Sequence, residues 1–209
     1  MANPSEFNSV GAFWDHLYAP DVYRYGLEPN EFFAEHTGAM PSGMKALLPG
    51  DGEGRNGVWL ARQGHDVTIV DASARGLDKA RTLAEHYRVN PTFVHADLTV
   101  WEPEPDTFDL VGALYVHIKS ALRAGVHTKY AAALKPGGTL LIEAFSLAQM
   151  TYGSGGPGNP DLLFSIDQLR EDFDGLIIEK LDEEEVILDH GTAHEGEGVV
   201  IRLIAKKAL

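Results

Sequence analysis

Residues 47–57, LLPGDGEGRNG, form an apolar run that turns on glycines and continues into a helical pattern. Such a strand–turn–helix lets the backbone approach a ligand closely and directs unpaired amide N–H groups at it. Gly52, Gly54 and Gly57 fit the pattern G-x-G-x-x-G, and Asp71 ends the next apolar run roughly 20 residues later. An acid at that place can accept hydrogen bonds from ribose hydroxyls. The stretch therefore predicts a site for an adenosine-containing cofactor, and the pattern alone fits a dinucleotide equally well.

Around this stretch, short apolar runs alternate with amphipathic patterns, which is typical of a parallel sheet covered by helices. We predict an α/β, Rossmann-like, doubly wound seven-stranded sheet, mostly parallel with an antiparallel C-terminal strand. The C-terminal third adds two extended segments that form an antiparallel hairpin. The predicted strands are 45–48, 66–71, 92–95, 108–115 and 139–145, the predicted helices are 56–63, 73–88 and 120–134, and the hairpin strands are 176–188 and 197–206.

The length of 209 residues predicts a single domain. Residues 1–42 are dense in aromatic side chains, 43–145 would form the cofactor-binding core, and 146–209 an acceptor loop followed by the hairpin. We expect Trp14 and Tyr25 to fold over the cofactor as a lid whose aromatic faces attract a cation and exclude water. An N-terminal helix packed on the domain is the alternative.

Composition excludes several classes of function. Lysine and arginine number 17 against 31 acidic residues, and the net charge of -14 repels nucleic acid and anionic membranes. The chain has 0 cysteines, which excludes disulfides, thiolate metal ligands and a cysteine nucleophile. The N-terminus lacks the pattern of a secretory signal, and no apolar run has the length of a membrane span. These features predict a cytoplasmic protein, and they set no oligomeric state.

The order of motifs resembles the class I S-adenosylmethionine-dependent methyltransferases. The motifs are the glycine loop followed by VDAS (70–73), ADL (96–98), FDLV (108–111) and LKPGGTL (134–140). GRN (54–56), WLA (59–61) and Tyr25 with Gly26 look like the tellurite-resistance and thiopurine methyltransferase-like branch. The resemblance implies methyl transfer from S-adenosylmethionine to a small-molecule acceptor such as a thiol, selenium or tellurium compound.

The resemblance also assigns cofactor contacts. The glycine loop would contact the methionine part, Asp71 the ribose, and Asp97 with Leu98 the adenine edge, although Asp97 could instead cap a turn. Ala113 would line the methionine pocket. The predicted cofactor-binding residues are Trp14, Tyr25, Gly50, Asp51, Gly52, Asn56, Asp71, Ala72, Ser73, Asp97, Leu98 and Ala113.

One position departs from the family. In the family, an acid usually stands two residues before the first glycine of the loop, which is Gly50 here, and holds the amino group of the cofactor. This chain has Leu48 at that position. Asp51 or Glu53 would replace that acid, or backbone and water would hold the ammonium.

On the acceptor side we predict His117, Tyr152 and His194, each of which could also be an ordinary surface residue. A general base is optional, because a methyl group on a sulfonium is already activated and a thiol or selenol ionises easily. His190 and His194 lie in a turn-like segment without a zinc-binding pattern, so we predict no metal site.

Two alternative functions stay open. The glycine pattern permits an NAD-dependent oxidoreductase, although the chain leaves no room for a separate substrate domain. The departure at Leu48 permits a non-catalytic S-adenosylmethionine-binding protein.

Overall fold

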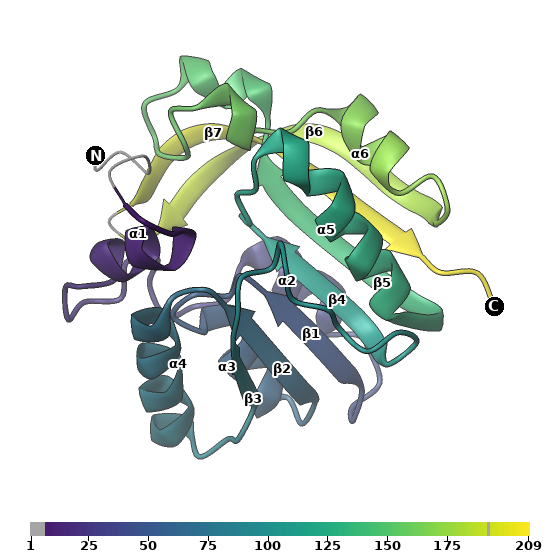
Figure 1. Ribbon diagram of the computed structural model, residues 1–209, viewed down its shortest axis with the longest axis horizontal. Coiled ribbons are helices and arrows are strands. Elements are labelled where there is room, and N and C mark those ends of the chain that lie inside the picture. The colour runs from purple at the N-terminus through teal and green to yellow at the C-terminus, as the bar shows by residue number, and fades with distance from the viewer. Residues whose placement is uncertain (1–6, 192) are drawn as a thin grey trace.

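The computed structural model describes residues 7–191 and 193–209. One seven-stranded sheet has the order β3-β2-β1-β4-β5-β7-β6 (Figure 1). The first five strands run parallel, and β7 is antiparallel to both neighbours, which confirms the predicted fold class. The strands are β1 (Lys45–Pro49), β2 (Asp66–Asp71), β3 (Thr92–His95), β4 (Phe108–Leu114), β5 (Leu134–Phe145), β6 (Ile177–His190) and β7 (His194–Lys206).

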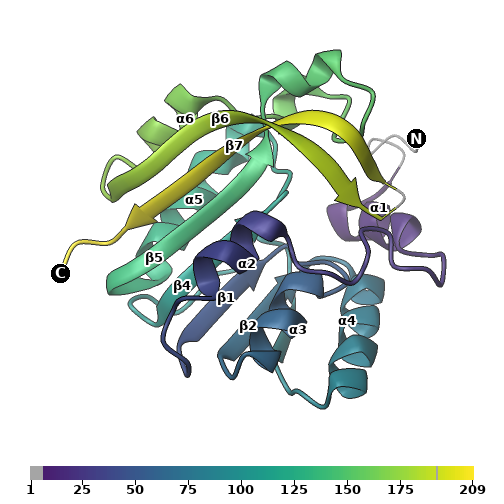
Figure 2. The same ribbon diagram turned by 180° about the vertical axis from the view of Figure 1, so that it is seen from behind.

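Helices cover both faces of the sheet. α2, α3 and α4 pack their apolar side chains into one core cluster, and α5 and α6 pack into another on the opposite face (Figures 1 and 2). α1 packs against α4. The helices are α1 (Val10–Leu17), α2 (Glu31–Thr37), α3 (Arg55–Arg62), α4 (Ala74–Tyr87), α5 (Ser120–Ala133) and α6 (Ile166–Asp172), with short 3-10 turns η2 (Leu147–Thr151) and η3 (Pro160–Leu162).

The predicted element boundaries hold within a few residues in the central part, because apolar periodicity and capping residues mark them. Ser73 caps α4 by accepting from the amide of Gly76 at 2.9 Å. The end of α5 differs from expectation. The helix stops at Ala133, one residue before its predicted end, and β5 begins at Leu134 rather than at 139, since Leu134 already pairs with Phe108.

The switch point of the topology lies between β1 and β4, from which the sheet grows in opposite directions. Ligands of open α/β sheets bind outside the carboxyl ends of the strands at such a point. Here Gly50 follows β1 and Val116 comes shortly after β4. A Cβ built on Gly50 would lie 3.0 Å from Cγ2 of Val116, so the two loops touch.

The predicted hairpin is confirmed, and its strands are longer than expected. β6 and β7 pair from Ile177↔Lys206 to His190↔His194 and reach beyond the sheet toward the segment that follows α1 (Figure 2). A Cβ built on Gly191 would lie 2.4 Å from the carbonyl oxygen of Arg24. The hairpin tip therefore packs against the N-terminal segment.

Candidate active site

The glycine loop is fixed by two carboxylates, the buried Asp71 and the half-buried Asp51. Asp71 accepts from the amide of Gly52 at 2.8 Å and from the amide of Ser73 at 2.7 Å. Asp51 accepts from the amide of Gly57 at 2.7 Å and from Nδ2 of Asn56 at 2.9 Å. Burial raises the pKa of Asp51 to about 6. Together these bonds hold the loop in one conformation at the carboxyl end of β1.

Two glycines of the motif are required by space and backbone conformation. A Cβ on Gly57 would lie 2.5 Å from the side chain of Ile69, so this glycine lets α3 pack closely on β2. Gly54 has φ of 86°, in the left-handed region, and a Cβ there would lie 2.6 Å from Cβ of Ala80. The motif thus has a structural cause in the turn itself.

Asp71 lies where the ribose acceptor was predicted. It is 6% exposed, and burial raises the pKa of its carboxyl. Each carboxylate oxygen accepts one backbone amide and has a second acceptor direction left. The carboxyl group therefore fits the paired hydroxyls of a ribose, and the neighbouring glycine backbone fits a ligand that approaches closely.

The N-terminal helix covers this carboxylate. Tyr18 is 6% exposed, and a Cβ on Gly52 would lie 2.3 Å from its hydroxyl oxygen. Trp14 stacks on Tyr18 with ring centroids 5.5 Å apart. Asp15 fastens the helix by accepting from Oγ of Ser73 at 2.6 Å. Tyr18 was not predicted as a site residue, although it stands one helical turn after Trp14 and so shares its face.

The second half of the predicted lid is tied to the loop. Glu53 accepts from the amide of Arg24 at 2.7 Å and forms an ion pair with Lys79. Nη1 of Arg55 donates to the carbonyl of Tyr25 at 3.2 Å. Glu53 is thus occupied by Arg24 and Lys79, whereas each carboxylate oxygen of Asp51 accepts one bond and keeps a second acceptor direction, as in Asp71.

Asn56 joins the loop to the start of α2. Its Nδ2 donates to Asp51, and its Oδ1 accepts from the amide of Asn30 at 2.8 Å. The side chain is 4% exposed. Its polar groups thus connect two segments of the chain, and its predicted cofactor contact stays a prediction.

Four further residues predicted to contact the cofactor lie at the carboxyl ends of β2, β3 and β4. Asp97 accepts from the amide of Thr99 at 2.9 Å and from its hydroxyl at 2.8 Å, so it caps the following turn. Leu98 packs against the core cluster that α5 covers. Ala113 is 3% exposed and lines a small interior cavity of about 10 Å³. The carbonyl of Ala72 lies 2.9 Å from Nε2 of His95.

The three residues predicted on the acceptor side differ in their surroundings. His117 stacks on Phe145, with ring centroids 6.1 Å apart, and burial lowers its pKa to about 4. Its Nδ1 is buried without a partner among the described residues. The hydroxyl of Tyr152 donates to Oε1 of Glu185 at 3.3 Å. His194 begins β7, and its side chain lies outside the described part of the structure.

A group of buried polar residues was missed. Glu143 is 1% exposed on β5 and accepts from Nδ2 of Asn30 at 2.5 Å and from Nε of Arg202 at 2.7 Å. Tyr115 binds the same carboxylate and has φ of 57°, a strained conformation for a tyrosine directly after a strand. The available signal was Glu143 itself, an acid inside the apolar run LLIEAF.

Residues 47–138 match the methyltransferase domain family. The match covers less than half of the chain, and over these residues the chain is similar to a methyltransferase domain. The match begins in β1 and ends in β5, so it contains the glycine loop, Asp71 and the end of β4.

Individual relatives are distant. The sterol 24-C-methyltransferase of Clavispora lusitaniae is 27% identical over 125 residues, which are 58% of this chain and 33% of that protein. The chain thus matches about a third of the length of its curated relatives. A structure described for the conversion of a disulfide bond into a thioacetal group in echinomycin biosynthesis has a TM-score of 0.75 at 21% identity, covering 96% of this chain and 93% of that one.

The predicted resemblance to the tellurite-resistance branch is less well supported than the match to a methyltransferase domain. TehB from Haemophilus influenzae has a TM-score of 0.69 at 17% identity, covering 94% of this chain and 66% of that one. Likeness at this identity shows a shared fold.

Two further findings concern the described residues alone. They contain no group of three or more histidine, cysteine, aspartate or glutamate residues arranged to hold a metal ion. No helix among them is both long and apolar enough to cross a membrane.

Proposed function

We propose that this protein transfers the methyl group of S-adenosylmethionine to a small-molecule acceptor. The observation that carries the proposal is the bond between Asp71 and Gly52, which places a carboxylate with free acceptor directions beside a glycine turn at the switch point. The methyltransferase domain that contains both residues supports it.

The chain would hold the cofactor mainly through groups at the carboxyl ends of β1, β2 and β4. Asp71 would bind the ribose hydroxyls, the backbone from Gly50 to Gly52 the methionine part, and Asp97 the adenine edge. When bound, S-adenosylmethionine supplies a methyl group that passes to an acceptor lone pair while the carbon–sulfur electron pair stays on sulfur.

The remaining task of the chain is to align the acceptor and exclude water. Trp14 and Tyr18 on α1, with Tyr25 in the following segment, would close over the cofactor.

His117 is neutral near pH 7, because burial keeps its pKa at about 4. An acceptor that enters as an anion, such as a thiolate, brings no proton that would have to be removed. We propose a cytoplasmic location and one domain, the latter supported by the single sheet.

The alternatives differ in what they bind and release. An NAD-dependent oxidoreductase would use the same glycine pattern for a dinucleotide. A non-catalytic protein would bind S-adenosylmethionine without consuming it.

Methyl transfer is tested with S-adenosylmethionine labelled in its methyl group and a panel of thiols, amines, phenols, selenite and tellurite. We expect label in an organic-extractable product with at least one acceptor. Asp66→Asn, at the far end of the strand that carries Asp71, serves as the matched control and should retain the activity, whereas Asp71→Asn should lose most of it. Tight binding of S-adenosylhomocysteine with no labelled product from any acceptor would favour the non-catalytic alternative.

A further inference from the structure

Residues 18–26, which follow α1, lie against the glycine loop and are called the cover segment below. A Cβ on Gly52 would lie 2.3 Å from the hydroxyl oxygen of Tyr18, and a Cβ on Gly76 in α4 would lie 3.1 Å from the ring of the same tyrosine. The segment thus meets both the loop and the helix that Asp71 joins. The contacts that hold it decide how the proposed cofactor site is closed.

Lys79, on α4, binds the cover segment at several positions. Its Nζ donates to the carbonyl of Pro20 at 2.9 Å and to that of Val22 at 2.8 Å. The hydroxyl of Tyr23 donates to the carbonyl of Lys79 at 3.0 Å, and the ammonium lies 5.0 Å from the centre of the Tyr23 ring. This one residue therefore fixes residues 20–23 on the surface of α4.

The third N–H group of the Lys79 ammonium reaches the glycine loop. Nζ of Lys79 forms an ion pair with Glu53, which stands between Gly52 and Gly54. The side chains of Lys79 and Glu53 are 15% and 4% exposed. The other oxygen of Glu53 accepts from the amide of Arg24, in the cover segment, at 2.7 Å. Loop, helix and cover segment therefore meet at one pair of opposite charges.

The burial of this pair makes it sensitive to the loss of one partner. A carboxylate that is shielded from water and loses its cation keeps the cost of desolvation without the attraction that offset it. Without the Lys79 ammonium, Glu53 would regain water only if the cover segment moved away from it. Lys79 therefore favours the closed position of the segment through its own bonds and also through Glu53.

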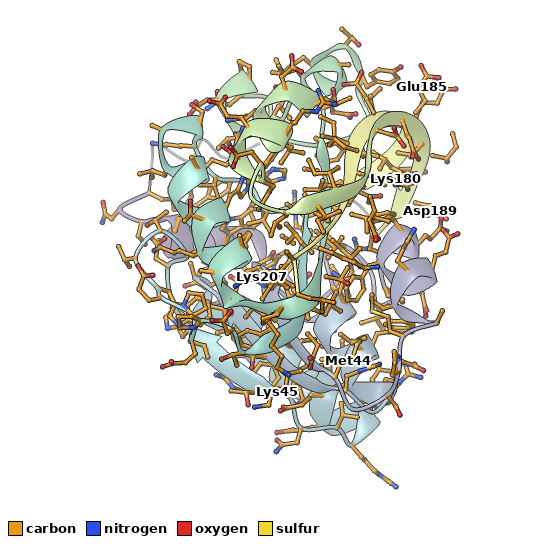
Figure 3. All side chains as sticks on the ribbon, turned by 90° about the vertical axis from the view of Figure 1, so that its right-hand side faces the viewer. Met44, Lys45, Lys180, Glu185, Asp189 and Lys207 are labelled. Carbon is orange, nitrogen blue, oxygen red and sulfur yellow. The ribbon has the colours of Figure 1, made fainter. Side chains whose placement is uncertain are left out.

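The hairpin tip meets the cover segment by close backbone packing. A Cβ on Gly191 would lie 2.7 Å from the amide nitrogen of Gly26, and Gly191 has φ of 64°, in the left-handed region. Asp189, which Figure 3 labels on β6, is an exposed acid two residues before this contact. The hairpin thus supplies a packing surface, whereas α4 supplies the buried charge pair.

We propose that Lys79 is a positioning residue for the methyl donor. Through its bonds to the cover segment and to Glu53 it keeps the segment closed on the glycine loop, and it thereby slows the release of a bound S-adenosyl compound. The identity of that compound rests on the proposed function. The link between Lys79, Glu53 and the cover segment can be measured without any ligand.

The first measurement is amide hydrogen exchange of the full chain without ligand. In Lys79→Met we expect the amide of Arg24 to exchange at least about tenfold faster, because methionine neither donates to the segment nor neutralises Glu53. Arg81→Met is the matched control, since it removes another cation of α4, which is 43% exposed and pairs with Asp78 on the same helix. It should change the exchange of Arg24 by less than about twofold.

A second control separates local opening from unfolding of the whole domain. Asp109, near the start of β4, accepts from the amide of Lys45 and from Nζ of Lys135, both at 2.8 Å. Asp109→Asn should lower the stability of the whole domain and leave the exchange of Arg24 unchanged, because opening of the cover segment does not break these bonds. Faster exchange of Arg24 in Asp109→Asn would mean that the segment opens only when the domain unfolds, and it would overturn the inference.

Glu53→Gln tests the charge pair itself. The new side chain can still accept from the amide of Arg24, but it carries no charge for Lys79. We expect faster exchange of Arg24 in Glu53→Gln, and no further acceleration when this change is added to Lys79→Met, because it then removes a buried charge without a cation. Additive effects would contradict the pair. Asp189→Asn, which removes an exposed acid, should change the exchange by less than about twofold.

The second measurement is the release of S-adenosylhomocysteine followed by stopped-flow fluorescence. We expect release at least about fivefold faster from Lys79→Met than from the unchanged chain, with Arg81→Met equal to the unchanged chain. Faster exchange of Arg24 without faster release would overturn the positioning role. Failure of the unchanged chain to bind S-adenosylhomocysteine would count against the proposed function instead, and the exchange results would still decide whether Lys79 and Glu53 hold the cover segment.

Discussion

The carboxylate of Asp71 accepts a hydrogen bond from the amide of Gly52 at 2.8 Å, which joins the end of β2 to the turn after β1. The same side chain accepts from Ser73 at the start of α4. One buried acid thus fixes the glycine turn and the following helix relative to each other. The group proposed to bind the ribose is therefore also part of the fold.

Replacing this acid should affect both roles. In Asp71→Asn one carboxylate oxygen becomes an NH2 group, which cannot accept the amide of Gly52 or Ser73. We expect a loss of about 1–3 kcal/mol in the free energy of unfolding and a ten- to hundredfold weaker binding of S-adenosylhomocysteine. Chemical denaturation and calorimetry measure the two effects. Unchanged cofactor affinity in a folded Asp71→Asn protein would refute the ribose assignment.

The close packing of α3 on β2 can be tested with a pair of glycines. In Gly57→Ala the new Cβ would lie 2.5 Å from Ile69, and we expect a destabilisation of about 1–3 kcal/mol. Gly125 lies in α5, and a Cβ there meets no atom within 4 Å, so Gly125→Ala should stabilise by about 0.5–1 kcal/mol. Urea denaturation compares them, and equal effects at both positions would contradict the packing argument.

His117 gives a pH-dependent prediction. Burial lowers its pKa from 6.5 to about 4, so the folded state favours the neutral ring. Its contribution to stability is fully present above pH 6.5 and is lost as the pH falls through about 4. Relative to His117→Gln, the unchanged chain should lose roughly 3 kcal/mol between pH 7 and pH 4. His86→Gln, at an exposed position, provides the control.

The pH prediction is measured by denaturation at several pH values. A stability difference between the unchanged chain and His117→Gln that stays constant from pH 7 to pH 4 would mean that His117 is exposed to water.

The role of α1 as a cover leads to a kinetic prediction. Asp15 holds α1 through Ser73 at 2.6 Å and through the amide of Arg75 at 3.0 Å. Asp15→Ala should let the helix open more often, so S-adenosylhomocysteine should associate and dissociate several-fold faster with a smaller change in Kd. Stopped-flow fluorescence of Trp14 can follow this. Rates in Asp15→Ala that match those of the exposed-site control Asp21→Ala would contradict gating by α1.

Sequence patterns predicted the central strands and helices because apolar periodicity, glycine turns and N-caps act over a few residues. The bond from Asp71 to the glycine loop agrees with the motif because both sit at adjacent strand ends. Tyr18 was missed, since its place over Gly52 depends on how the N-terminal segment folds back. The pair of Glu143 and Arg202 depends on the register of β5 and β7, which composition and spacing do not encode.

The most direct test of the account is titration calorimetry of S-adenosylhomocysteine into the unchanged chain, with NAD as the comparison ligand. The account predicts saturable binding of one S-adenosylhomocysteine per chain and no measurable binding of NAD. Binding of NAD without S-adenosylhomocysteine, or of neither compound, would contradict the claim that the glycine turn and Asp71 hold an adenosyl methyl donor.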